Sequence, residues 1–326
     1  MRVAPTNRPT MHRSLITCLL SLLSLLACSQ NPIVRTTPTE GIITLAEGVE
    51  IPKVPEGYVL WMPENARPEG MLVFIHHRPE HDRNDLIALA LSQNLAVIHA
   101  ITENRLEWFF DPARMQQIEN YLYEAITEYN IPADRLYYCG MSLGGTRALK
   151  LAIYGQSKAS KHRLTPRAVV MCDSPLDMVR FHRECSKAAS VNFSEAGAAE
   201  GAWVSECLRT NLGGTPSEAR EAYINYAPYC YSAEGGPYLQ ALSGIAIRAY
   251  TEPDIHWWIE HRRKDYYSMN SLDMAALVND LKILGHVEAE LITTENKGYT
   301  NTGERHPHTW NIVDEVGMIA WLKALR

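Results

Sequence analysis

One stretch near the middle of the chain constrains its fold more than any other. A short run rich in β-forming residues, 136–139, leads directly into the motif Gly-x-Ser-x-Gly, formed by Gly140, Ser142 and Gly144. A helical pattern follows over residues 143–154. A strand that turns sharply into a helix exposes a serine hydroxyl on a strained turn, where a neighbouring base can reach it. The pattern therefore predicts strand, turn and helix around a nucleophilic serine.

Apolar runs alternate with helical patterns along most of the chain. The expected strands are 71–75, 95–99, 136–139, 167–172, one within 241–250, and 286–292, and the expected helices are 85–93, 112–129, 143–154, 271–284 and 310–325. Two further strands, 42–45 and 58–62, are expected to pair antiparallel at the edge of the sheet. The alternation predicts a mostly parallel sheet with helices on both faces. Ligands of such sheets bind beyond the carboxyl ends of the strands, where Ser142 falls.

These features resemble the α/β-hydrolase superfamily, in which the turn is called the nucleophile elbow and Ser142 matches the nucleophile. The resemblance covers nearly the whole chain after the amino-terminal segment. It implies the α/β-hydrolase fold and a serine hydrolase that works through an acyl-enzyme. It also implies that an acid and a histidine follow the serine in that order.

The chain offers that order of residues. Asp254 lies in the loop after the strand that ends near residue 250 and matches the acid position; Glu252 and Asp173 are the alternatives. His308 immediately precedes the last helix and matches the base, with His306 as the alternative. The resemblance thus predicts a triad of Ser142, Asp254 and His308.

An oxyanion hole needs two backbone N–H donors. The resemblance places one at Leu143, the first residue of the elbow helix, and the other in the loop after strand 71–75. Relatives often have His-Gly in that loop, whereas this chain has His76-His77, so the second donor is His77 or Arg78.

Metal and nucleic-acid chemistry have little support in the sequence. Four residues look superficially like metal ligands, but their spacing is not that of a zincin helix; they are His76, His77, His81 and Asp82. A net charge of -6 and a pI near 6.1 give no basic footprint for nucleic acid. We therefore expect no metal and no cofactor.

A long insertion separates strand 167–172 from the next strand. We expect residues 178–240, rich in Tyr, Ala, Glu and Gly, to form a helical cap over the site. In an oxidising compartment one disulfide could form among Cys185, Cys207 and Cys230, with the pairing left open.

Two aromatic residues follow the expected acid loop. Trp257 and Trp258 leave that loop close to the site, and we expect at least one of them to line an acyl or sugar subsite. The competing interpretation is that both pack under the cap as core.

The amino terminus predicts export. An apolar run over residues 15–27 is too short to span a bilayer comfortably and is typical of a signal peptide at 1–27. It ends in Leu-Leu-Ala-Cys, which resembles the lipobox of bacterial lipoproteins and implies lipidation of Cys28. Residues 28–40 would then be a tether and 41–326 the hydrolase domain. The expected location is the cell envelope, with a lipid anchor at Cys28 as the only membrane contact; the alternative is a secreted protein.

The length of 326 residues and 46% hydrophobic content fit one large domain with an insertion. The function expected from the resemblance is carboxylic-ester hydrolysis, with ester-decorated carbohydrate suggested only by the expected location. The alternatives are a serine peptidase and an inactive binding protein with the same fold.

Overall fold

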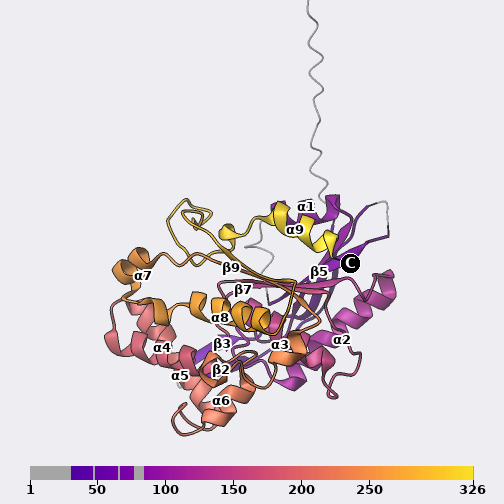
Figure 1. Ribbon diagram of the computed structural model, residues 1–326. Helices are drawn as coiled ribbons and strands as arrows, with labels where there is room; N and C mark the ends of the chain where they lie inside the picture. The colour runs from indigo at the N-terminus through magenta and orange to yellow at the C-terminus, as the bar shows by residue number, and fades with distance from the viewer. Residues whose placement is uncertain (1–30, 47, 65–66, 77–83, 326) are drawn as a thin grey trace, which may run out of the picture.

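The computed structural model describes residues 31–46, 48–64, 67–76 and 84–325 (Figure 1). The expected signal peptide and the lipidation of Cys28 lie outside these residues and stay predictions. His77 and Arg78, the two candidates for the second oxyanion donor, also lie outside them. Within the described part of the chain, no helix is long and apolar enough to cross a membrane.

An eight-stranded sheet forms the centre of the molecule, in the order β1-β4-β6-β5-β7-β8-β9-β10. Every pairing from β6 to β10 is parallel, whereas β4 is antiparallel to both β1 and β6. The strands are β1 (Ile33–Thr37), β4 (Glu56–Trp61), β5 (Gly70–Ile75), β6 (Leu95–Ile101), β7 (Leu136–Met141), β8 (Ala168–Cys172), β9 (Ala246–Thr251) and β10 (Ala289–Thr293). The predicted parallel sheet is confirmed, with strand bounds that shift by a few residues at some ends.

The predictions at the sheet edge are wrong in two respects. β2 (Ile42–Ala46) does not pair with the strand near residue 58 but with β3 (Val49–Pro52), in a separate two-stranded sheet. Gly48 has a φ of +72°, which permits the short connection between these two strands. β4 instead pairs with β1, which lies within the segment expected to be a tether. β1 is held there because Ile33 packs against the main core.

Helices cover both faces of the sheet because its central strands are buried on both faces. In β5, Met71, Val73 and Ile75 enter one hydrophobic core and Leu72 and Phe74 enter the other. This produces the continuous apolar run seen in the sequence. The first core is covered by α2 (Pro112–Tyr129), α3 (Leu143–Gln156) and α8 (Asn270–Ile283). The second is covered by α1 (Asn84–Ser92) and α9 (Glu315–Ala324), at the top of the view in Figure 1.

The insertion between β8 and β9 is helical, as the sequence predicted. It contains α4 (Met178–Val191), α5 (Glu195–Leu212) and α6 (Arg220–Tyr226), followed by the short 3-10 helices Tyr231–Ala233 and Leu239–Leu242. Its helices share a small core of their own that includes Phe181, Val204 and Tyr223. A buried ion pair, Arg180 Nε to Asp273 Oδ1 at 2.7 Å, joins α4 to α8. The insertion is thereby fixed to the main domain at the end of β8.

The cysteines of the insertion form no disulfide. Cys185, Cys207 and Cys230 are all buried free thiols, as are Cys139 and Cys172 in the sheet. The expectation that two of the three cysteines could pair is therefore not met. Burial raises the pKa of the Cys207 thiol to about 11, so this side chain stays protonated and packs as a small apolar group.

Candidate active site

The predicted elbow is present at the carboxyl end of β7. Ser142 follows β7 directly and precedes α3, and its φ of 52° and ψ of -128° lie outside the regions that L-residues normally occupy. Its backbone N–H donates to the Cys172 carbonyl at 2.8 Å, which holds the turn against the end of β8. Strain of this kind is characteristic of functional turns.

Two glycines make the turn possible, and one of them is not in the expected motif position. A Cβ on Gly140 would lie 2.2 Å from the Gly144 carbonyl carbon, and a Cβ on Gly145 would lie 2.0 Å from Ser174 Oγ. A Cβ on Gly144 would meet nothing closer than the Ile75 carbonyl at 3.9 Å. Close packing of the helix therefore requires glycine at 140 and 145 rather than at 144.

His308 is paired with Asp173. Its Nδ1 lies 2.5 Å from Asp173 Oδ2, and the carboxylate can only accept, so Nδ1 carries the hydrogen. Asp173 follows β8 with a φ of 43°, and its side chain is only 8% exposed. This tautomer leaves Nε2 of His308 free to accept a proton, as a general base requires.

The choice of Asp254 as the partner of the histidine is therefore wrong. Asp254 Oδ2 accepts from Arg305 Nη2 at 2.6 Å, and its Oδ1 accepts from the Trp257 backbone N–H at 3.0 Å. The second bond makes Asp254 the N-cap of α7 (Ile255–Arg262). Partial burial opposes the charge, but the bonds from Trp257 and Arg305 prevail and lower the pKa of the Asp254 carboxyl. Asp254 thus has a structural role in which its charge is already matched.

Glu252, the other alternative acid, anchors the loop that carries the histidine. Its buried carboxylate accepts from the backbone N–H groups of Lys297 and Gly298, at 3.0 and 3.1 Å. It also forms an ion pair with Arg305 at 2.6 Å. Arg305 therefore binds Glu252 and Asp254 together, three residues before His308. This network positions the loop but does not contact the His308 ring directly.

His306, the alternative base, bonds to a backbone carbonyl rather than to a carboxylate. Its Nδ1 donates to the backbone carbonyl of His308 at 3.0 Å, and its ring lies 4.9 Å from that of Trp257. Burial, together with the neighbouring His308, lowers the pKa of His306. His306 accordingly holds the backbone of His308 in place, and it lines the same cavity.

The oxyanion donor predicted at Leu143 is the first residue of α3. The first N–H groups of a helix have no partner within that helix, and they point outward from its N-terminus. The structure thus places Leu143 where the prediction requires an N–H, next to Ser142. Its role in catalysis stays a prediction.

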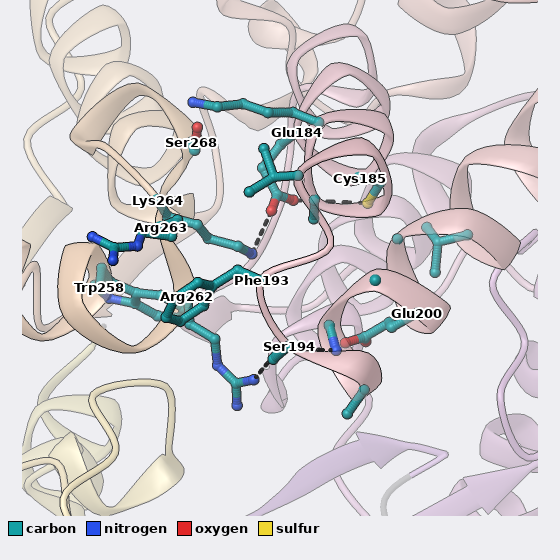
Figure 2. Close-up of a pocket in the computed structure, with 18 of the residues that line it drawn as sticks. Glu184, Cys185, Phe193, Ser194, Glu200, Trp258, Arg262, Arg263, Lys264 and Ser268 are labelled. Carbon is teal, nitrogen blue, oxygen red and sulfur yellow. Dashed lines mark hydrogen bonds and ion pairs between the residues drawn. The ribbon is translucent and has the colours of Figure 1, made fainter.

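Ser142 and His308 line one cavity of about 330 Å³. A hydrogen bond between the two side chains is not among those formed by the described residues, and catalytic hydrogen bonds are often long until substrate binds. The rest of the wall comes mainly from α4, α5 and the segment from Trp258 to Asn270 (Figure 2). The insertion therefore does cover the serine.

The structure favours the first of the two interpretations made from the sequence, because one tryptophan lines the cavity and neither is buried as core. Trp258 lines the cavity, and its ring lies 6.5 Å from the His308 ring. Trp257 is not among the lining residues; it stacks on His261 at 4.8 Å and contacts Trp258 edge-on at 5.1 Å. Cavity-lining side chains that the sequence did not single out include Trp108, Phe181 and Arg262.

Solved structures with a similar fold include an acylaminoacyl peptidase from Pyrococcus horikoshii, at a TM-score of 0.52 and 14% identity over 90% of this chain and 42% of that one. Esterase B from Lactobacillus rhamnosis gives a TM-score of 0.50 and 15% identity over 84% of this chain and 82% of that one. A puromycin-hydrolyzing peptidase of Mycobacterium tuberculosis gives 0.50 and 13%, over 90% and 38% of the two chains. No family model matches the chain, and no curated protein matches it in sequence.

These neighbours and the sheet order show that the chain has the α/β-hydrolase fold. The chain spans about two-fifths of the length of the acylaminoacyl peptidases that it matches, because the match covers 42% of their residues. At sequence identities of 13 to 15%, these similarities show the fold and nothing about the activity.

Proposed function

We propose that this protein is a serine hydrolase that cleaves carboxylic esters, with Ser142 as nucleophile, His308 as general base and Asp173 as the acid that orients the histidine. The observation that carries the proposal is the Asp173–His308 hydrogen bond at 2.5 Å, made by a histidine that lines the same cavity as Ser142. A strained serine, a histidine in the correct tautomer and a buried carboxylate are the three parts of a catalytic triad.

The proposed reaction has two halves. Ser142 Oγ attacks the ester carbonyl carbon while His308 Nε2 takes the hydroxyl proton, and the N–H of Leu143 stabilises the developing oxyanion. The carbon–oxygen bond of the leaving alcohol then breaks, and the alcohol departs with the proton from His308. Water attacks the acyl-enzyme with His308 again as base, and the acid product leaves as Ser142 recovers its proton.

The proposal is tested by covalent labelling with a fluorophosphonate. An activated serine forms a stable phosphonyl adduct that mimics the tetrahedral intermediate, so we expect one label per chain, located on Ser142 by peptide mass spectrometry. Protein denatured before exposure to the probe is the control, because labelling requires the assembled site. A failure to label, or a label on a different serine, would contradict the proposal.

We also propose that Trp258, rather than Trp257, contacts the substrate. Trp258→Ala removes a large apolar wall of the cavity near His308, so we expect KM for a bulky aryl or glycan ester to rise about tenfold, with kcat for a small aryl acetate changed by less than about threefold. Trp257→Ala is the matched control, since that ring packs on His261 and His306 and should chiefly lower the melting temperature. The reverse pattern would assign the contact to Trp257.

A further inference from the structure

The cavity that Ser142 lines has an unusual distribution of charge. Two of its lysines are already paired: Lys264 with Glu184, and Lys187 with Asp265. In the described part of the chain, Arg262 and Arg263 form no ion pair, and Glu200 on α5 is the lining carboxylate that forms none either. The wall therefore carries a surplus of positive charge.

The two arginines differ in what they contact. The Arg263 guanidinium lies over the Phe193 ring, 4.8 Å from its centroid. Arg262 instead points toward the start of α5, where its Nη1 donates to Ser194 Oγ at 3.3 Å (Figure 2). That hydroxyl also accepts from the Gly197 backbone N–H, as the N-cap of α5. One long hydrogen bond to a shared hydroxyl uses little of a guanidinium that has five N–H donors.

Helix geometry relates Arg262 to Trp258, the residue whose ring lies near His308. Trp258 and Arg262 are four residues apart on α7 and hence neighbours on one face of the helix. Both line the cavity, and the Trp258 ring lies 6.5 Å from the ring of His308. Arg262 lies about one helical turn, roughly 5 Å along the axis of α7, from Trp258. A group bound at Arg262 would therefore lie in the same cavity as Ser142 and next to the Trp258 side chain.

We propose that Arg262 is an anion-recognition subsite and that the substrates are esters carrying a carboxylate a few bonds away from the scissile carbonyl. The planar guanidinium matches a carboxylate in two parallel hydrogen bonds, and the half-buried cavity wall strengthens the pairing relative to open water. The inference rests on the proposed ester hydrolysis and specifies its substrate class. The carboxylate can stand on the acyl or on the alcohol side of the ester.

The test uses two pairs of esters matched in size. Mono-4-nitrophenyl glutarate is compared with 4-nitrophenyl valerate, and 4-acetoxybenzoate with 4-acetoxybenzamide, so that each pair differs in one charge on one side of the bond. We expect the wild-type protein to prefer the anionic member of at least one pair by about tenfold in kcat/KM, an effect that declines as salt rises from about 0.02 M to 0.5 M.

The variants assign the preference to a residue. Arg262→Gln should remove the preference by raising KM for the anionic member, with kcat/KM for the neutral member within about twofold of wild type. Arg262→Lys should retain part of the preference. Glu200→Gln removes the opposite charge from the same wall and should not reduce the preference. A wild type without preference in either pair, or a preference that survives Arg262→Gln, overturns the inference.

A binding measurement separates this inference from the proposed function. Glutarate alone should raise the melting temperature of Ser142→Ala protein, in which no hydrolysis is possible, and should fail to do so when Arg262→Gln is added. Absence of ester hydrolysis together with this shift would refute the proposed function and leave the anion subsite standing. An equal shift of the melting temperature by glutarate in both proteins, or no shift in either, would refute the subsite even if neutral esters are cleaved.

Discussion

Ser142→Ala is expected to reduce kcat for aryl ester hydrolysis by about 10⁶-fold, the loss found when the nucleophile of a serine triad is removed. The hydroxyl supplies the attacking oxygen, and it comes from the residue that directly precedes α3 and lines the same cavity as His308. The change adds no strain at the φ of 52°, because Ser and Ala both carry a Cβ there. The melting temperature should therefore stay within a few degrees of wild type.

Ser268→Ala is the matched control for that measurement. Ser268 lines the same cavity, and its hydroxyl donates to Asp265 Oδ1 at 2.9 Å, away from the histidine. Its removal should change kcat less than about fivefold, since the remaining bonds of that turn persist. If Ser142→Ala kept more than about a thousandth of the wild-type rate, a different nucleophile would have to be sought.

The central sheet was predictable because its strands are buried on both faces. β5 and β8 read as unbroken apolar runs, β6 is interrupted only by His99, and the Gly-x-Ser-x-Gly turn between β7 and α3 fixes the order of elements around them. The edge of the sheet was not predictable in the same way. β1 is largely exposed, so its sequence carries no apolar alternation that distinguishes it from a tether.

Helix α7 shows a second limit of the sequence. None of its residues is buried, so the segment Ile255–Arg262 packs no apolar face into a core. Its start is set by Asp254, whose carboxylate caps the helix. A capping aspartate and a catalytic aspartate after a strand look alike in sequence, and the helix is the reason that Trp258 and Arg262 face the cavity together.

The identity of the acid was undetermined in sequence for a geometric reason. β8 and β9 are parallel neighbours, so Asp173 and Asp254 both emerge at the same edge of the sheet, and either satisfies the order Ser, acid, His. Arg305 decides between them. It lies three residues before His308 and takes Asp254 and Glu252 as its partners, which leaves Asp173 as the carboxylate that contacts the ring. A single basic residue in a polar loop gave no sign of this role in the sequence.

Asp173→Asn is expected to reduce kcat by about 10⁴-fold, the effect of the same change in serine protease triads. An Asn amide donates to Nδ1 of His308, which moves the imidazole hydrogen to Nε2 and leaves no lone pair to take the proton of Ser142. Asp254→Asn should reduce kcat by less than about tenfold, because asparagine caps helices as well as aspartate does and the Arg305–Glu252 ion pair remains. Steady-state kinetics on a small aryl ester, with melting temperatures for both variants, make the comparison.

A large loss in Asp254→Asn beside a nearly active Asp173→Asn would show that the histidine changes partners in the working enzyme. The expected pattern instead means that the acid is supplied by the loop after β8, directly before the insertion, so that the orientation of His308 and the placement of the cap over Ser142 depend on the same few residues of backbone.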